Sequence, residues 1–425
     1  MPAESQLVQI EKPIYGGAFL ARVEGKAVFV PLALPGEQAR VRVVADKRGY
    51  AQAEVEEIVA PSQERVAPAC RHFGICGGCD YQHANYEAQL AFKQAVLRET
   101  LERGGVHAPA ETSALAANPW EYRNRIRLAM DAAGNPGYRG RRSHAVVPIA
   151  ECPIAAPLLV RAALAIQEIA ANLFPHLRGT EIALFCNAEE TALMVGIDSS
   201  KPARIPLKDF CAALATKVPE FSGAEYAIDS GAGQPPRTVA CCGHTSLTYR
   251  AAGSAYRVDH GAFFQVNRWL VDSLVDAVAS GHRGALAWDL FAGVGLFARR
   301  LASSFMRVVA VESAPSATTA LAHNFNGTGA RAVKTNTLDF LRRRQKGERP
   351  DFIVVDPPRT GLGAETTALL ADVAAPALVY VSCDPATLAR DLRALIASGY
   401  VIEKAVLADL FPQTFHIETI VHMRR

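Results

Sequence analysis

The segment Ala287-Trp288-Asp289-Leu290-Phe291-Ala292-Gly293-Val294-Gly295 runs from a short apolar strand into a turn that contains two glycines. Helix-forming residues follow it at 297–301. Glycines allow the backbone to approach a ligand at the carboxyl end of a strand, where open α/β sheets bind cofactors. The segment therefore predicts the first strand and cofactor loop of an α/β domain. The third glycine of a dinucleotide fingerprint is missing, but Ala298 stands where a glycine or an alanine is allowed, so NAD remains possible on this element alone.

The chain beyond this segment alternates short apolar strands with helical stretches. Further strands are expected at 308–311, 352–356 and 378–382. That alternation is typical of a parallel, doubly wound sheet. Glu312 follows the second strand, where a carboxylate can accept hydrogen bonds from both ribose hydroxyls of an adenosine. We therefore interpret residues 251–425 as a Rossmann-like cofactor-binding domain.

The 425 residues are too many for one ordinary domain, so a multidomain protein is expected. Residues 1–62 contain short strands broken by glycine and proline, a spacing that predicts a small β-barrel. Residues 63–250 mix helical and strand patterns and are interpreted as an α+β central region. Its helices are expected at 86–103 and 157–173, and its strands at 125–130, 182–186 and 192–197.

The overall composition is globular, with 50% hydrophobic residues and a formal net charge of only +3, which argues against a uniformly basic nucleic-acid binder. Six arginines nevertheless gather between Trp120 and His144. A solvated arginine-rich face is the alternative to a nucleic-acid surface there. The first residues lack a signal-peptide pattern, and no apolar stretch reaches the ~18 residues of a membrane span. We expect a cytoplasmic protein, a monomer, with no membrane partner.

Three of the nine cysteines lie within ten residues, at Cys70, Cys76 and Cys79, with glycines between them. Cys152, followed by proline, could supply a fourth ligand. In a reducing compartment, clustered thiols more often bind metal than form disulfides. Either an iron–sulfur cluster or a structural zinc ion suits this pattern.

A candidate nucleophile, Cys383, comes directly after the strand expected at 378–382. The preceding strand of the domain ends in Asp356-Pro357-Pro358-Arg359. In methyltransferases that modify exocyclic amines, a comparable segment ends in an aromatic residue that stacks on the base. Arginine takes that place here, which argues against amine methylation.

The thiol offers a different chemistry. A thiolate that adds to C6 of uracil turns C5 into an enolate carbon, which can attack an activated methyl group. A base must then remove the C5 proton. Cys383 fits the first role, and Glu418 or His416 fits the second. The alternatives are a buried, inert cysteine at a strand end and a surface carboxylate on an edge strand.

Taken together, these motifs resemble the RNA 5-methyluridine methyltransferases that carry an N-terminal TRAM domain and a [4Fe–4S] cluster. The resemblance covers nearly the whole chain. The motifs that carry it are Lys26–Pro31, 34–37, the cysteine loop, 122–125, 263–267, 356–359, 382–385 and 411–418.

This resemblance implies a role for each candidate site residue. Cys383 would be the nucleophile and Glu418 the base that resolves the adduct. Cys70, Cys76, Cys79 and Cys152 would hold the [4Fe–4S] cluster. Gln265, Phe291, Glu312 and Asp356 would hold S-adenosylmethionine and orient the base, with Asn336 as a further contact. Residues 122–127 would lie in an RNA-binding region.

The implied substrate is a uridine in structured RNA. 23S ribosomal RNA is favoured by analogy with the ribosomal enzymes, and transfer RNA is the alternative. A cytosine-5 methyltransferase would use the same addition of a thiolate to the base. Its cysteine usually follows a proline, however, whereas Ser382 precedes Cys383 here. A non-enzymatic RNA-binding iron–sulfur protein would require Cys383 and Glu418 to be incidental.

Overall fold

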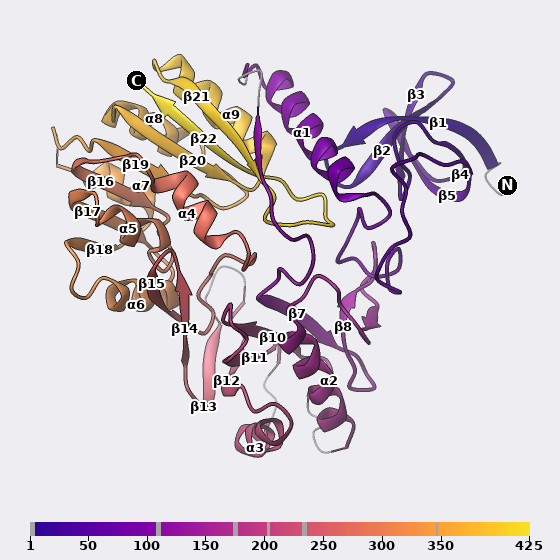
Figure 1. Ribbon diagram of the computed structural model, residues 1–425, viewed down its shortest axis with the longest axis horizontal. Helices are drawn as coiled ribbons and strands as arrows, with labels where there is room; N and C mark the ends of the chain where they lie inside the picture. The colour runs from indigo at the N-terminus through magenta and orange to yellow at the C-terminus, as the bar shows by residue number, and fades with distance from the viewer. Residues whose placement is uncertain (1–4, 108–111, 173–176, 202–204, 232–235, 346) are drawn as a thin grey trace.

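A closed five-stranded barrel forms the N-terminal part of the computed structural model, which describes residues 5–107, 112–172, 177–201, 205–231, 236–345 and 347–425 (Figure 1). The barrel order is β1 (Ser5–Ile14), β2 (Ala18–Val23), β3 (Lys26–Pro31), β5 (Tyr50–Ala60) and β4 (Gln38–Asp46), closed by pairing of β4 with β1. Buried and exposed residues alternate at the start of β4, as expected when one strand face points into a barrel. The barrel predicted from the sequence is confirmed. Residues 1–4, part of the segment that lacks a signal-peptide pattern, lie outside the described residues.

A seven-stranded sheet forms the central part. Its order is β13 (Arg237–Gly243), β12 (Phe221–Ile228), β11 (Leu193–Ser199), β10 (Glu181–Cys186), β7 (Arg125–Met130), β8 (Pro136–Arg139) and β9 (Val146–Pro148). Helices α2 (Pro157–Asn172) and α3 (Leu207–Lys217) pack against each other and against this sheet. The α+β character of this region is confirmed. The predicted end of the helix at 157–173, Leu173, lies outside the described residues.

An eight-stranded sheet dominates the C-terminal part. Its order is β18 (Ala330–Lys334), β17 (Phe305–Glu312), β16 (Gly284–Leu290), β19 (Phe352–Val355), β20 (Ala377–Ser382), β22 (Glu418–Arg424), β21 (Val401–Ala408) and β6 (Ser113–Leu115). The five strands from β18 to β20 are parallel, and β22 runs antiparallel between β20 and β21. Glu418 therefore starts an internal strand rather than an edge strand.

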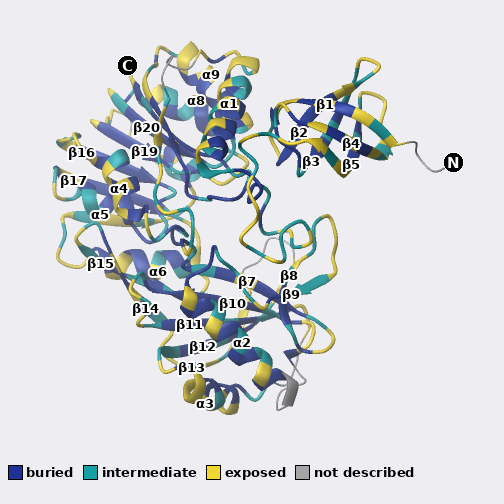
Figure 2. Cartoon of the chain, turned by 45° about the vertical axis from the view of Figure 1, so that its right-hand side comes forward, coloured by how far each residue is buried: buried dark blue, intermediate teal, exposed yellow. Residues whose placement is uncertain are grey.

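Helices cover both faces of this sheet, and apolar clusters join them to it (Figure 2). One face carries α4 (Val271–Ala279), α5 (Leu296–Leu301), α6 (Pro315–Asn324) and the hairpin β14 (Ser246–Ala251)–β15 (Ser254–Asp259). The other carries α1 (Tyr86–Arg103), α7 (Thr337–Arg343), α8 (Ala364–Val373) and α9 (Pro385–Ala397). This is the doubly wound α/β domain expected from the sequence.

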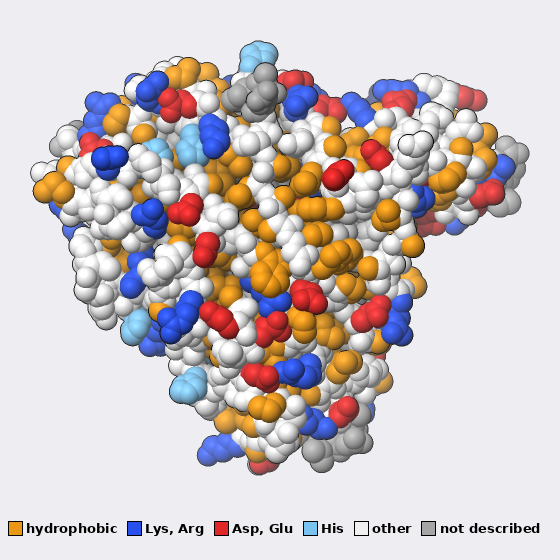
Figure 3. Space-filling model, viewed as in Figure 1, with side chains coloured by type: hydrophobic (Ala, Val, Ile, Leu, Met, Phe, Trp, Pro, Cys, Tyr) orange, Lys and Arg blue, Asp and Glu red, His pale blue; other side chains and the backbone are white. Residues whose placement is uncertain are grey.

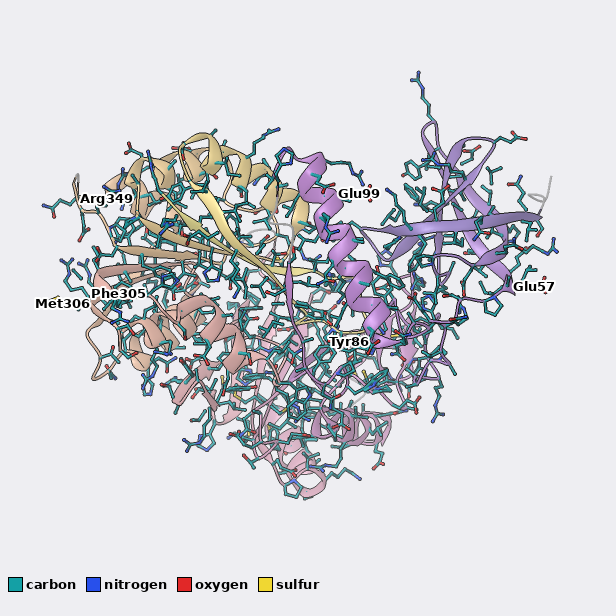
Figure 4. The ribbon with its side chains drawn as sticks, turned by 45° about the horizontal axis from the view of Figure 1, so that its top comes forward. Glu57, Tyr86, Glu99, Phe305, Met306 and Arg349 are labelled. Atoms are coloured by element: carbon teal, nitrogen blue, oxygen red, sulfur yellow. The ribbon has the colours of Figure 1, made fainter. Side chains whose placement is uncertain are left out.

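Helix α1 connects the parts of the molecule. It packs against α9, and its Glu99 carboxylate accepts a hydrogen bond from Lys12 of β1 at 2.8 Å. Figure 4 shows α1, marked by Tyr86 and Glu99, between the barrel and the C-terminal sheet. Strand β6, which follows α1, pairs with β21 at the sheet edge. A strand from the first third of the chain thus forms one edge of the eight-stranded C-terminal sheet.

Charges of both signs are interspersed on the face of the molecule shown in Figure 3. This distribution agrees with the small net charge. Among the helices that the structure describes, none combines the length and apolar character needed to cross a membrane.

Candidate active site

Most of the predicted site residues gather at one edge of the C-terminal sheet. Glu312 ends β17, Phe291 follows β16, Asp356 follows β19, and Cys383 follows β20. These four strands are parallel and neighbours, so their carboxyl ends meet at this edge. Glu418 begins the antiparallel β22 and therefore lies at the same edge. The topology brings together residues that are 127 positions apart at the extremes (418 − 291).

A pocket at this edge is lined by Gln265, Phe291 and Asp356, together with Gly293 and Leu296. Phe291 and Gly293 both have positive φ values, 67° and 55°, so the chain turns sharply where β16 ends. A Cβ added to Gly293 would meet nothing within 4 Å, which leaves its surroundings open to a ligand. Three of the four predicted cofactor residues therefore share one pocket.

Glu312, the fourth, is a half-buried carboxylate that shapes the same turn. It accepts hydrogen bonds from the backbone N–H groups of Gly293 (2.8 Å), Ser313 (2.6 Å) and Ala314 (2.7 Å). A carboxylate has about four lone-pair sites, so one remains for a ligand hydroxyl. Asn336 instead caps α7, where its side chain accepts from the Asp339 N–H at 2.8 Å. It is not among the residues that line this pocket.

Asp289 was not predicted as a site residue, yet it lies fully buried beneath the cofactor turn. One carboxylate oxygen accepts from the Ala298 N–H of α5 at 2.8 Å, and the other has no partner within the described residues. Burial raises the pKa of Asp289 to about 8, with further contributions from Asp356 and Glu312. The residue was visible in the sequence as an acid inside an apolar strand, which is a signal of a buried polar role.

Cys383 and Glu418 lie at the same end of the neighbouring strands β20 and β22, and the charge of Glu418 acts on the Cys383 thiol. Ser382 pairs with Thr419 in this antiparallel ladder, so the next positions along the two chains are Cys383 and Glu418. Burial, followed by the carboxylates of Glu418 and Asp356, raises the pKa of the Cys383 thiol to about 12, and Arg359 opposes this shift.

The carboxyl group of Glu418 is buried, with 6% exposure. Burial and the neighbouring Asp356 raise its pKa well above the usual range, and Arg359 opposes this shift. Burial also raises the pKa of Asp356 to about 7. Two coupled carboxyl groups with raised pKa values beside a thiol are typical of a site that transfers protons.

His416, the alternative base, lies in the loop before β22 rather than in the strand. Burial and then Arg359 lower its pKa to about 4. Its Nδ1 atom lies 3.2 Å from the Arg359 guanidinium, which can only donate, so Nδ1 accepts. The ring is therefore neutral at physiological pH. Its unprotonated nitrogen, Nδ1, already accepts a hydrogen bond from Arg359.

Arg359 is expected to control how readily Cys383 ionises. In an Arg359→Gln variant the opposing positive charge is lost, so the pKa of Cys383 should rise by up to about one unit. The thiolate fraction at any pH below that value should then fall by up to about tenfold. Iodoacetamide labelling of the Cys383 peptide, followed by mass spectrometry from pH 7 to 10, measures this. The exposed Arg331 provides a matched Arg→Gln control, and an unchanged labelling profile in Arg359→Gln would contradict the assigned electrostatics.

The loop at residues 409–417 carries the chain from β21 to Glu418, and buried polar contacts hold it. Lys93 of α1 donates to Asp409 Oδ1 (2.5 Å) and to the Phe411 carbonyl (2.9 Å). Gln89 of α1 exchanges two hydrogen bonds with Gln413, each 3.0 Å long. The 409–417 loop is therefore fixed by a helix more than 300 residues earlier in the chain.

Residues that follow the cysteine loop (residues 70–79) also contact the 409–417 loop. The backbone N–H groups of Asp80 and Tyr81 both donate to the Gln413 carbonyl, at 2.8 and 3.0 Å. Tyr122 donates from its hydroxyl to the Pro412 carbonyl at 3.0 Å. Gln413 has a positive φ of 68°, an uncommon conformation that these contacts stabilise. Sequence analysis could not pair these segments, although Lys93 at a core-facing position of α1 was a signal of a buried partner.

A Lys93→Met variant is expected to lose about 3–5 kcal/mol of unfolding free energy, because it leaves the Asp409 carboxylate buried without its cation. Chemical denaturation followed by circular dichroism measures this loss. Lys12→Met is the matched control, since the exposed Lys12–Glu99 pair should contribute about 1 kcal/mol or less. Equal losses in the two variants would show that the buried pair does not hold the 409–417 loop.

The four predicted metal ligands, Cys70, Cys76, Cys79 and Cys152, line a single cavity. The Gly78 N–H donates to the Cys76 sulfur at 3.3 Å, and the Tyr138 hydroxyl lies 3.7 Å from the Cys152 sulfur. A Cβ on Gly77 would come within 3.0 Å of the Arg139 carbonyl, so a glycine is needed there. Among the described residues, no group of three or more His, Cys, Asp or Glu side chains is arranged to hold a metal ion.

Two of the three arginines of residues 122–127, Arg123 and Arg125, make contacts inside the protein, and the third, Arg127, is exposed. Arg125 lies over the Phe185 ring at 4.3 Å and donates to the Ala262 carbonyl. Arg127 pairs with Glu181 and Asp198. Arg123 donates to the Tyr122 hydroxyl and lines the cysteine cavity. Arg123 and Arg125 help to hold the fold together, whereas the surface ion pairs of Arg127 contribute little and leave it able to contact a phosphate. An RNA-binding role for residues 122–127 stays a prediction.

A mostly parallel sheet with a glycine turn after its first strand and an acidic residue after the second defines a class of α/β proteins that bind a nucleotide-like cofactor at the carboxyl ends of their strands. Comparisons with known proteins agree. The family model tRNA (Uracil-5-)-methyltransferase matches residues 345–425, and the TRAM domain model matches residues 1–55.

Two curated relatives are both named 23S rRNA (uracil(1939)-C(5))-methyltransferase RlmD. The protein from Halomonas elongata is 33% identical, over 96% of this chain and 87% of its own. The protein from Chromohalobacter salexigens is 34% identical, over 98% and 89%. The crystal structure of Pyrococcus abyssi tRNA (uracil-54, C5)-methyltransferase with S-adenosyl-L-homocysteine shares the fold, with a TM-score of 0.77 and 23% identity over 98% of this chain and 100% of that one.

The chain belongs to the family of RNA uracil-C5 methyltransferases. It is accordingly an enzyme that uses S-adenosylmethionine as the methyl donor.

Proposed function

We propose that this enzyme methylates C5 of a single uridine in 23S ribosomal RNA, with Cys383 as the nucleophile and Glu418 as the base. The observation that supports the mechanism is that Cys383 and Glu418 lie at the same end of two paired strands, close enough to interact electrostatically, at the sheet edge that carries the cofactor pocket. The ribosomal substrate is supported by the names of the curated relatives, which match nearly the whole chain.

The side chains at the site suit each step of the reaction. The Cys383 thiolate adds to C6 of the uracil, and the electron pair of the C5=C6 bond moves into an enolate. C5 then takes the methyl group, and S-adenosylhomocysteine leaves. Glu418 removes the remaining C5 proton, the C5=C6 bond forms again, and the C6–S bond breaks to release the thiolate. The charges balance, because the proton taken by Glu418 is afterwards released to water.

Glu418 is a better base than His416 for this proton. Its raised pKa makes the carboxylate more basic than an exposed one, whereas the pKa of His416 is lowered and its free nitrogen contacts Arg359. Before reaction the uridine must leave its stack to reach Cys383, which costs a few kcal/mol. Gln265, Phe291, Glu312 and Asp356 are proposed to hold the methyl donor and orient the base.

The test of this function is methyl transfer to defined RNAs. Unmodified 23S ribosomal RNA and a transfer RNA transcript are incubated with the full-length protein and radiolabelled S-adenosylmethionine. Label should appear in 5-methyluridine at one position of the 23S transcript. Label confined to the transfer RNA would replace the ribosomal assignment, and no transfer to either RNA would refute the proposed function.

We also propose a [4Fe–4S] cluster held by Cys70, Cys76, Cys79 and Cys152. Four thiols around one cavity, with donors near two sulfurs, suit a cluster. Each thiolate of a cluster binds a different iron atom, so the sulfurs stand further apart than the four ligands of one zinc ion, which lie only about 2.3 Å from their metal. Anaerobic purification should give brown protein with about four iron atoms per chain. Colourless protein with stoichiometric zinc would refute the cluster.

A further inference from the structure

A groove beside the candidate active site is lined by arginines that the methyl-transfer chemistry does not use. It lies between the barrel, the end of α1 and the first half of α9, and its positive side chains are Arg103, Arg390 and Arg393. None of the described residues that line it is acidic. We name it the arginine groove.

The floor of the arginine groove is formed by close packing of α1 on α9. A Cβ added to Gly104 would come within 2.5 Å of the Ala389 Cβ, so glycine is required for this approach. Ala386, Ala389, Arg390 and Arg393 are spaced three and four residues apart and therefore share one face of α9. That face is about 10 Å long from Ala386 to Arg393, which is enough to follow more than one nucleotide of a strand.

The groove is continuous with the candidate active site. On the barrel side the groove is lined by Tyr15, whose hydroxyl donates a hydrogen bond to Asp384 Oδ2 at 3.1 Å. Asp384 follows Cys383 directly and caps α9 through the Ala386 and Thr387 N–H groups. The Tyr15 ring also packs edge-on against Phe415 of the 409–417 loop, with ring centres 5.8 Å apart. A strand that leaves the site along α9 would enter this groove.

The arginines differ in how free they are to bind a ligand. Arg393 is exposed, and in the described part of the chain it makes no ion pair or hydrogen bond. Arg103 pairs only with Glu99, on the surface of its own helix. Arg390 is committed to the buried Asp391 and to the Thr360 carbonyl. Arg103 and Arg393 can therefore turn toward an anion at small cost, since exposed ion pairs contribute little.

We propose that the arginine groove binds backbone phosphates of the RNA strand next to the methylated uridine. Arg103 and Arg393 are then substrate-positioning residues that carry no sequence information. This inference rests on the proposed RNA substrate. The charge of the groove, its length along α9 and its continuity with Cys383 favour a polyanionic strand over an apolar or cationic partner.

The test compares an Arg103→Gln/Arg393→Gln double variant with wild-type enzyme on the 23S transcript. The KM for RNA should rise on the order of tenfold at moderate salt, and the slope of log affinity against log salt should fall by roughly 1.4, about 0.7 for each lost phosphate contact. The kcat at saturating RNA and the affinity for S-adenosylmethionine should not change.

The control is an Arg331→Gln/Arg349→Gln variant, with the same charge change at two other exposed positions. Figure 4 places Arg349 on the side of the molecule opposite the barrel. A second experiment replaces single phosphates near the uridine by uncharged methylphosphonates. At a phosphate that the groove contacts, the replacement should raise the KM for RNA with wild-type enzyme but should not raise it further with the double variant.

An RNA KM and salt slope equal to those of the control would overturn the groove assignment even if the wild-type enzyme methylates 23S RNA. Failure of the wild-type enzyme to methylate any RNA would instead refute the function on which the assignment rests. Unchanged melting temperatures of both double variants exclude misfolding as the cause of a rise in KM.

Discussion

Replacing Cys383 by alanine is expected to abolish methyl transfer, with a loss of at least about a thousandfold in kcat. The reason is that C5 of uracil is a poor nucleophile until a thiolate adds at C6. The variant should still bind S-adenosylmethionine and RNA, because Cys383 is not among the residues that line the cofactor pocket or the arginine groove. Single-turnover assays with labelled methyl donor measure the chemical step directly.

RNA that contains 5-fluorouridine provides a second readout for Cys383. The fluorine at C5 cannot be removed as a proton, so wild-type enzyme should stop as a covalent protein–RNA complex that survives denaturing electrophoresis. Cys383→Ala should give no such complex. Cys241, an exposed cysteine of the central sheet, supplies the matched control, and Cys241→Ala should react as wild type. A Cys383→Ala variant that retains methyl-transfer activity would refute the assigned mechanism.

A Glu418→Gln variant is expected to lose turnover while keeping the first half of the reaction. The thiolate can still add and C5 can still be methylated, but glutamine cannot take the C5 proton. Turnover should fall by on the order of 10²–10⁴. A methylated covalent complex should accumulate on ordinary uridine RNA, without any fluorine.

The pH dependence separates Glu418 from other bases. The carboxyl group acts as a base only when it is ionised, and its raised pKa places this ionisation well above the usual range. The rate at which the methylated covalent complex breaks down should therefore rise with pH through that region in the wild-type enzyme, and this rise should be absent in Glu418→Gln. Glu403→Gln, at a half-exposed position of neighbouring β21, is the matched control. If His416→Gln rather than Glu418→Gln trapped the complex, the base would be reassigned.

Much of the C-terminal fold follows from local sequence. Strands β16, β17, β19 and β20 lie within a few residues of the apolar runs that predict them, because buried parallel strands need continuous hydrophobic side chains. Helix α1 has the predicted bounds, 86–103. Cys383 and Asp356 were identifiable as site residues because the carboxyl ends of parallel strands meet at one edge.

The remaining features depend on contacts distant in the chain. The position of β22 between β20 and β21 brings Glu418 to the same sheet edge as Cys383, and no local pattern specifies that strand pairing. Strand β6 is only three residues long and is defined by β21, its partner. The partners of Arg125 and Arg127, among them Phe185 and Asp198, lie on other strands, so the sequence could not pair them.

The dependence of the 409–417 loop on α1 bears on how the protein is made. Lys93 leaves the ribosome early, while Asp409 is 316 residues further along the chain. Contacts of such separation form late, because a long loop must close before they stabilise anything. A nascent chain can thus fold its barrel and central sheet, but Glu418, the proposed catalytic base, is not positioned until synthesis is nearly complete. Folding and the acquisition of catalytic competence should therefore coincide, and a chain that ends before Asp409 should be inert rather than partly active.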